Sequence, residues 1–401
     1  MSFFKLVQKW CNYNNWSDDW WGGLGGSSGS TQYGDDARNT LTGTRGKDYL
    51  YGLGDNDILV GRKGKDTLDG GSGNDLLNGG AGADTLKGGD GIDTITYEDS
   101  CEAVTINLAT GEAKGGDAEG DKFSSIENVT GSRYNDILTG DDGANELRGL
   151  AGKDTLTGAG GDDHLYGGTG RDTLYGGEGN DHLIGDDGTN ADYSEGAADT
   201  MYGGAGNDTY SVYQTDDVVI EFAGEGNDII LANVDYTLSA NVENMAMFGS
   251  AVRGTGNELA NKITGNDNDN IINGKGGQDD LVGGGGADTF VFDGADASSR
   301  DVLRDFTTGT DKIGISVSGF GIDLNAGDTL TADYFYNDPA NPANADPAQT
   351  DHGQFVLVQN SATNWSLYWD GDGGLSAESP IIGAVFNGGT APTLGDFVLV
   401  A

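Results

Sequence analysis

Apolar side chains recur singly at nine-residue intervals along much of this sequence, with glycines and acids between them. Residues 70–78 (GGSGNDLLN) and 79–87 (GGAGADTLK) show the pattern. Glycine takes position 1 and usually position 4, aspartate takes position 6, and an apolar residue takes position 8. The three residues around position 8 are predicted to form a short strand with its apolar side chain pointing inward, and the first six residues a sharp turn.

This nine-residue frame defines three arrays. Residues 34–96 hold seven copies, 131–211 hold nine, and 256–293 hold four. In the second array the copies at 185–193 and 194–202 are degenerate, although the frame is kept through them. Two copies would make one coil, so residues 18 apart are expected to stack. The predicted fold is all-β, with parallel β-roll arrays (a β-helix solenoid) capped by a C-terminal β-domain.

The turn residues indicate a chemistry. Glycine permits positive φ and close approach, which brings main-chain carbonyl oxygens toward one point. Aspartate at position 6 adds a carboxylate oxygen, and hard oxygen ligands suit Ca²⁺ better than zinc or copper. Each ion is expected between successive turns.

The predicted carboxylate ligands are Asp48, Asp57, Asp66, Asp75, Asp84, Asp93, Asp136, Asp154, Asp163, Asp172, Asp181, Asp199, Asp208, Asp279 and Asp288. The predicted glycines of these sites are Gly70, Gly73, Gly79, Gly82, Gly167, Gly170, Gly176 and Gly179. Asparagine replaces the acid at Asn39, Asn145, Asn190, Asn261 and Asn270. Those turns carry less charge and are expected to bind weakly or to stay empty.

Composition supports a need for cations. The chain has 65 acidic and 21 basic residues among 401, a formal net charge of −44, and only 35% hydrophobic residues. Burial of apolar surface alone would struggle against chain entropy and charge repulsion. The acidic balance argues against nucleic-acid binding, and no apolar run is long enough to span a bilayer.

The repeat resembles the glycine-aspartate nonapeptide of RTX (repeats-in-toxin, haemolysin-type calcium-binding) proteins, and the resemblance covers nearly everything after residue 33. It implies several bound calcium ions, export by type I secretion machinery, and folding on extracellular calcium. Residues 301–306 and 311–313 resemble the cap that ends many such proteins. Residues 395–401 (GDFVLVA) resemble their uncleaved secretion signal, whereas the start of the chain lacks a signal-peptide pattern.

The segments follow from the arrays. We expect an aromatic cap or docking segment at 1–33, β-rolls at 34–96, 131–211 and 256–293, spacers at 97–130 and 212–255, and the C-terminal cap with the secretion signal at 294–401. Residues 337–351 are expected to form a loop, and 370–374 a turn or a lone weak calcium site. Two free thiols, Cys11 and Cys101, are favoured over one bridge.

The sequence contains no recognisable catalytic motif. The only histidines are His164, His182 and His352, no H-E-x-x-H is present, and the G-x-S-x-G match at 25–29 lacks a strand–turn–helix context. His164 and His182 should stack, as a transition-metal pair or as solvated side chains. Tyr166, Ile184 and Tyr202 should share one face, and Tyr175 and Tyr193 the other.

The chain is therefore expected to be a secreted calcium-binding protein without enzymatic activity, with a surface, matrix or adhesion role. Self-association or binding of a surface glycan is an additional option. The alternatives are a polysaccharide-modifying enzyme or accessory module, and an effector that interacts with host membranes.

Overall fold

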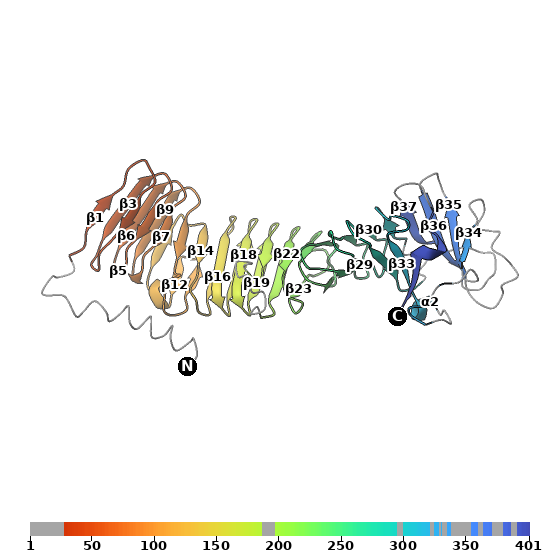
Figure 1. Ribbon diagram of the computed structural model, residues 1–401. Helices are drawn as coiled ribbons and strands as arrows, with labels where there is room; N and C mark the ends of the chain where they lie inside the picture. Colours follow the sequence, from red (N-terminus) through yellow and green to blue (C-terminus); the bar gives the residue numbers. More distant parts are fainter. Residues whose placement is uncertain are drawn as a thin grey trace, which may run out of the picture. The chain divides into compact units, whose positions relative to one another are not determined.

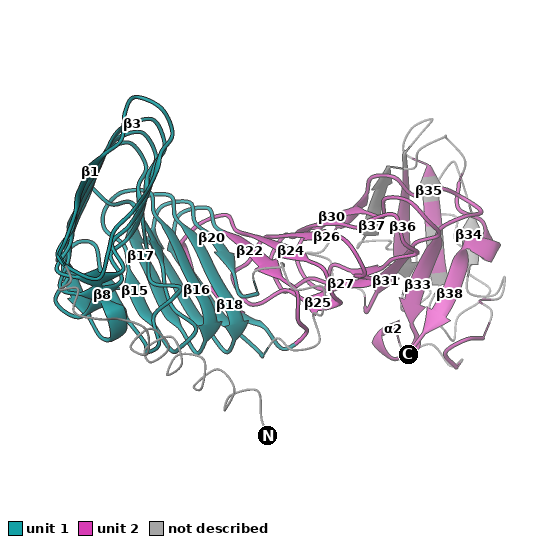
Figure 2. Cartoon of the chain, turned by 60° about the vertical axis from the view of Figure 1, so that its left-hand side comes forward, with its two compact units in different colours: residues 1–208, 216–218 teal, residues 209–215, 219–401 magenta. Residues whose placement is uncertain are grey.

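The computed structural model describes residues 28–186, 197–294, 300–320, 325–328, 330, 335–337, 354–359, 364–370, 380–385 and 391–401. The segment predicted at 1–33 is thus described only from residue 28. Nearly all of the loop predicted at 337–351, and the turn after Asp370, lie outside the described residues. The chain divides into two compact units, coloured teal and magenta in Figure 2: Met1–Asp208 with Asp216–Val218, and Thr209–Thr215 with Val219–Ala401.

Unit 1 is a stack of short parallel strands (Figure 1). One sheet has the order β1 (Thr31–Tyr33), β3 (Tyr49–Gly54), β6 (Thr67–Ser72), β9 (Thr85–Asp90) and β13 (Lys122–Ser124). A second has β2 (Thr40–Thr42), β4 (Ile58–Val60), β7 (Leu76–Asn78), β10 (Thr94–Thr96), β14 (Asn128–Thr130), β16 (Glu146–Gly152), β18 (His164–Gly170) and β20 (His182–Ile184). A third has β12 (Glu112–Lys114), β11 (Thr105–Asn107), β15 (Ile137–Thr139), β17 (Thr155–Gly160), β19 (Thr173–Glu178) and β21 (Thr200–Ala205). A small pair has β5 (Lys63–Gly64) and β8 (Ala81–Gly82).

The register explains the stack. Leu50 pairs with Leu68 and Leu68 with Leu86, so each strand lies beside the strand 18 residues later in the chain. One coil therefore contains two nonapeptides and two strands. The position-8 side chains of both strands point into the coil, and Leu59 and Leu77 are completely buried. The predicted all-β solenoid is confirmed.

The spacer at 97–130 interrupts the coils without ending the sheets. It adds the antiparallel strand β12, where Thr105 pairs with Lys114, and the short 3₁₀ helix η1 (Gly116–Ala118). Beyond them, β13 pairs in parallel with β9, and β14 pairs with β10. The ladders therefore resume after a longer excursion of the chain.

The prediction of two degenerate copies at 185–193 and 194–202 is wrong. The main-chain N–H of Asp163 donates to Asp181, 18 residues later, whereas the N–H of Asp172 donates to Asp199, 27 residues later. Gly185 lies against the carboxylate of Asp199, so both belong to one turn. The connection from Gly185 to Asp199 is therefore nine residues longer than in a regular turn, and an addition of nine residues leaves the frame unchanged.

The same nine-residue shift in pairing changes which tyrosines lie side by side. Tyr166 pairs with Ile184 as predicted. Tyr202 pairs with Tyr175 instead, and their stacked ring centroids are 4.8 Å apart. Tyr193 lies outside the described residues.

Unit 2 also contains parallel ladders. One has the order β22 (Thr209–Val212), β24 (Ile229–Ala232), β26 (Asn244–Met247), β28 (Lys262–Thr264), β30 (Asp280–Val282) and β32 (Val302–Leu303). Another has β25 (Tyr236–Thr237), β27 (Arg253–Thr255), β29 (Ile271–Asn273), β31 (Thr289–Phe292), β33 (Lys312–Ser316) and β38 (Phe397–Val400). β23 (Val218–Ile220) is divided between the units.

The end of the chain contributes to this second ladder. Ile313 of β33 pairs in parallel with Phe397 of β38, so residues 397–400 form a strand beside β33. A separate sheet contains β34 (Phe335–Asn337), β35 (Gln354–Gln359), β36 (Asn364–Asp370) and β37 (Pro380–Val385). The described residues of this unit include the short helices α2 (Val317–Phe320) and η4 (Leu394–Asp396). Within the described parts of the chain, no helix has the length and apolarity that a membrane crossing requires.

The inward position-8 residues should carry much of the stability. Leu156 is completely buried, and its replacement by alanine should lower the free energy of unfolding by about 2–5 kcal/mol. Thr157 is the next residue and faces outward, so Thr157→Ala should cost less than about 1 kcal/mol. Urea unfolding at saturating calcium measures both. Equal losses would contradict the burial argument.

Candidate metal sites

The position-6 aspartates form two rows of buried carboxylates along unit 1. In each row, one oxygen of every carboxylate accepts a hydrogen bond from a main-chain N–H of the preceding coil, and we call this the anchored oxygen. The N–H of Asp48 donates to Asp66 Oδ1 at 2.7 Å, and the N–H of Asp66 donates to Asp84 Oδ1 at 2.7 Å. Asp57 and Asp75 repeat the arrangement in the other row, also at 2.7 Å.

The second carboxylate oxygen in most of these turns is buried and has no hydrogen-bond partner among the described residues. This holds for Oδ2 of Asp57, Asp66, Asp75, Asp84, Asp93, Asp154, Asp163, Asp172, Asp181, Asp199 and Asp279. A buried charge without a partner is costly, so one such oxygen would call for an explanation. Its regular repetition indicates that each oxygen faces a bound cation.

The predicted glycines surround these oxygens. A Cβ built on Gly70 would lie 2.1 Å from Asp75 Oδ2, which is too close for any side chain. Gly79, Gly167 and Gly176 lie against the aspartate of their own turn in the same way.

The position-4 glycines bring main-chain oxygens together. Gly82 has a φ of 156°, and a Cβ there would lie 1.6 Å from the carbonyl oxygen of Gly64. Gly73, Gly170 and Gly179 have φ values of 124°, 132° and 135° and similar contacts with the preceding coil. The turns therefore pack carboxylate and carbonyl oxygens where no side chain fits.

The donor atoms fit calcium. Carboxylate and carbonyl oxygens are hard ligands, and Ca²⁺ accepts six to eight of them in flexible geometry. Magnesium demands near-ideal octahedra and retains water, which suits a main-chain turn poorly. When calcium is bound, it supplies the positive charge that the unpartnered carboxylate oxygens require.

Burial shifts the titration of these aspartates strongly. It raises the pKa of Asp154 to about 8, that of Asp84 to about 7 and that of Asp66 to about 6. Burial, followed by the nearby charges of Asp172, Asp217 and Asp186, raises the pKa of Asp199 to about 9. Without a cation these sites disfavour the charged carboxylates, and a bound cation reverses that preference.

Two predicted ligands are arranged differently. Asp48 Oδ2 accepts a hydrogen bond from the N–H of Thr44, and Asp136 Oδ2 accepts one from the N–H of Ser132. Burial acts to raise the pKa of Asp48, but hydrogen bonds from Ser30 and Thr44 outweigh it and lower the pKa. Neither aspartate has the unpartnered Oδ2 of Asp66 or Asp154.

The remaining predicted aspartates keep the anchored oxygen. Asp208 Oδ1 accepts from the N–H of Asp181, and Asp288 Oδ1 accepts from the N–H of Asn270, both at 2.8 Å. Asn145, Asn261 and Asn270 are buried at position 6. Asn190 lies outside the described residues.

Several acids that sequence analysis missed extend the rows. Asp121, Asp217, Asp301 and Asp311 each accept the main-chain N–H of a position-6 aspartate, namely Asp84, Asp199, Asp279 and Asp288. Carboxylate oxygens of Asp186, Asp199 and Asp217 lie within 4.8 Å of one another. A signal was present, because each of the four missed aspartates stands two residues before an apolar residue, as position 6 does before position 8.

Other side chains singled out in the sequence have clear places. His164 and His182 are paired on neighbouring strands, with ring centroids 5.7 Å apart at a steep angle. Cys101 is disulfide-bonded, so the expectation of two free thiols is wrong. The other cysteine of the sequence, Cys11, lies outside the described residues.

Loss of one charge in a row should weaken calcium binding locally. Asp163→Asn should reduce the affinity of the protein for at least one calcium ion about tenfold or more. The reason is that Asp163 Oδ2 accepts no hydrogen bond and is available to bind the ion. Asp162→Asn makes the same change at the neighbouring exposed residue and should leave the affinities unchanged. Calcium titration followed by native mass spectrometry distinguishes them, and equal titrations would argue against a ligand role for Asp163.

Comparison with known proteins agrees with this geometry. The family described as RTX calcium-binding nonapeptide repeat (4 copies) matches residues 33–68, 61–95, 124–156, 157–191, 193–219 and 255–290. These ranges fall on the three arrays and include nearly all of the anchored carboxylates. No curated protein gave a match. With its repeats, parallel coils and oxygen-lined turns, the chain belongs to the RTX calcium-binding repeat family.

Proposed function

We propose that this protein leaves the cell unfolded, folds outside it when calcium binds its turns, and there serves as a non-enzymatic surface, matrix or adhesion protein. The observation that carries the proposal is the pair of rows of buried aspartates with unpartnered Oδ2 atoms. These rows form the inside of the turns, so the coils and the bound cations depend on each other.

The negative charge of the chain explains why it would be unfolded at low calcium and folded at high calcium. At low calcium the net charge of −44 favours an expanded chain, which suits passage through an export channel. Calcium neutralises the rows, and its binding free energy becomes folding free energy. Calcium sites of extracellular modules commonly work in the millimolar range, which cytosolic calcium does not reach.

The outer faces support a contact role. Tyr33 and Tyr51 stack with ring centroids 5.0 Å apart, and Tyr33 is 67% exposed. Tyr175 and Tyr202 form a second stack. Stacked, partly exposed aromatic rings on a rigid sheet suit a partner such as an extracellular glycan or another protein surface.

Calcium should control the fold. In buffer with EGTA, far-UV circular dichroism should show little β structure, and millimolar CaCl₂ should restore it. Equimolar MgCl₂ is the control and should restore much less. The same β content in EGTA and in CaCl₂ would rule out the switch.

Location tests the rest of the proposal. Antibody detection in the producing cells should place the protein in the medium or on the cell surface, and chelation should release or unfold the surface fraction. Accumulation of folded protein in the cytosol would contradict an extracellular role.

A further inference from the structure

The turns of the three arrays are of two kinds. In what we term open turns, the position-6 carboxylate keeps Oδ2 unpartnered, as in Asp66 and Asp154. In what we term closed turns, the main-chain N–H of the residue at position 2 donates to the side chain at position 6. The closed turns begin at Gly34, Gly43, Gly131, Gly140, Gly256 and Gly265.

A closed turn is fastened by two linked hydrogen bonds. The N–H of Thr44 donates to Asp48 Oδ2 at 2.7 Å, while the N–H of Gly46 donates to the hydroxyl oxygen of Thr44 at 3.1 Å. The position-6 side chain and the position-2 side chain thus both accept main-chain hydrogens inside the turn.

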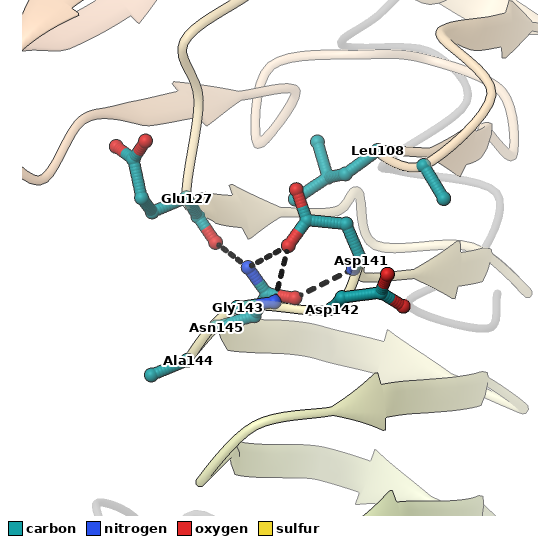
Figure 3. A pocket seen from close by; sticks show the side chains of 8 residues that line it. Leu108, Glu127, Asp141, Asp142, Gly143, Ala144 and Asn145 are labelled. Atoms are coloured by element: carbon teal, nitrogen blue, oxygen red, sulfur yellow. Dashed lines mark hydrogen bonds between the residues drawn. The ribbon is translucent and has the colours of Figure 1, made fainter.

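Asn145 shows the fuller version of this arrangement (Figure 3). The N–H of Asp141 donates to Asn145 Oδ1 at 2.7 Å, and the N–H of Gly143 donates to Asp141 Oδ1 at 2.9 Å. Asn145 Nδ2 donates to the carbonyl oxygen of Glu127 at 2.8 Å. The amide hydrogens therefore reach an inward carbonyl oxygen that a cation could otherwise bind.

The third array repeats the arrangement within unit 2. Asn261 Oδ1 accepts from the N–H of Asn257 at 2.8 Å, and Asn261 Nδ2 lies 3.2 Å from the carbonyl oxygens of Val242 and Glu243. Asn270 is bonded in the same way by Asn266 and donates to Ala251 at 3.4 Å.

Position 2 distinguishes the two kinds. In the closed turns it is always a residue whose side chain accepts the N–H two residues further on: Asp35, Thr44, Ser132, Asp141, Asn257 and Asn266. None of these has positive φ. Such Asx and Ser/Thr turns are ordinary local structures that stabilise themselves.

In the regular open turns position 2 has positive φ instead. The residues are Leu53, Arg62, Gly71, Gly80, Gly89, Leu150, Ala159, Gly168, Gly177 and Lys275, with φ between 69° and 128°. Position 4 follows the same division, since Gly64 has positive φ whereas Gly46 and Gly143 do not. Non-glycine residues rarely adopt this conformation, so Leu53, Arg62 and Leu150 accept strain that must be offset elsewhere.

We propose that the residue at position 2 decides whether a turn holds calcium. In turns of regular length, Asp, Asn, Ser or Thr there closes the turn with hydrogen bonds, whereas positive φ leaves the position-6 oxygen open to an ion. The turn from Gly185 to Asp199 is nine residues longer and lies outside this rule, because Asp199 Oδ2 is open although Asp186 stands at position 2. The closed turns are the first two repeats of each array. Every array therefore begins with one complete coil whose two turns are closed by hydrogen bonds. The calcium-binding coils stack onto this first coil.

This rule separates aspartates that the repeat pattern treats alike. Asp48 and Asp136 stand at position 6, yet they belong to closed turns and should hold no ion. Asp66 and Asp154 follow them in the same rows and should hold one.

The test compares the same substitution in the two kinds of turn. We expect Asp48→Asn and Asp136→Asn to fold and to bind as many calcium ions as the wild type, because asparagine already occupies this place at Asn39 and Asn145. Asp66→Asn and Asp154→Asn should lose at least one ion each. Native mass spectrometry of the full chain, at the free calcium concentration that just saturates the wild type, counts the ions.

Loss of an ion from Asp48→Asn or Asp136→Asn would overturn the proposal, even if the open-turn variants failed to fold. Thr44→Gly gives an independent test, because it changes residues 43–48 to the glycine pattern of an open turn. It should raise the ion count by one, and an unchanged count would also overturn the rule. Thr42→Gly, outside the turn, is the control and should bind the wild-type number.

Discussion

The structure depends on a carboxylate that is anchored by one oxygen and exposed to a cation by the other. The anchored oxygen binds the main-chain N–H of the preceding coil, as Asp66 does with Asp48, and so fixes the spacing between coils. The other oxygen is buried without a donor. Desolvating an unpaired charge costs several kcal/mol even after relaxation, and here the cost recurs in each open turn. A cation within the turn offsets this cost while the carboxylate stays charged, so the acidity, the regular register and calcium binding have one origin.

The same coil can also be completed without an open carboxylate. At the beginning of each array, asparagine amides and Asx or Ser/Thr turns fill the place with hydrogen bonds. In the spacers a longer acid takes over the anchor: the N–H of Asp93 donates to Glu127 at 2.8 Å, and the N–H of Asp228 donates to Glu243 at 2.9 Å. These substitutes keep the stacking while changing how much the local structure relies on calcium. The protein is therefore better described as three arrays, each of which begins with a hydrogen-bonded coil and continues with coils whose carboxylates are open, than as one uniform array.

The outward positions are free of this constraint. Positions 7 and 9 alternate with the buried position 8, so their side chains form rows such as Tyr175 with Tyr202 and His164 with His182. Such rows follow automatically from stacking and can stabilise the sheet by themselves. The outer rows are therefore the positions where a particular partner would be selected.

The sequence by itself determined the nine-residue period, the 18-residue coil, the buried leucines and the oxygen-rich turns. These depend on local rules, because glycine conformation and strand alternation are properties of neighbouring residues. The tertiary structure alone decided that Gly185 and Asp199 belong to one turn, since nine additional residues leave the sequence frame intact. It also decided that Asp48 and Asp136 differ from Asp66 and Asp154. The repeat places aspartate at position 6 in all four turns. The difference lies at position 2, where Thr44 and Ser132 stand in place of Arg62 and Leu150, and only the folded turn shows how that residue directs its main-chain N–H.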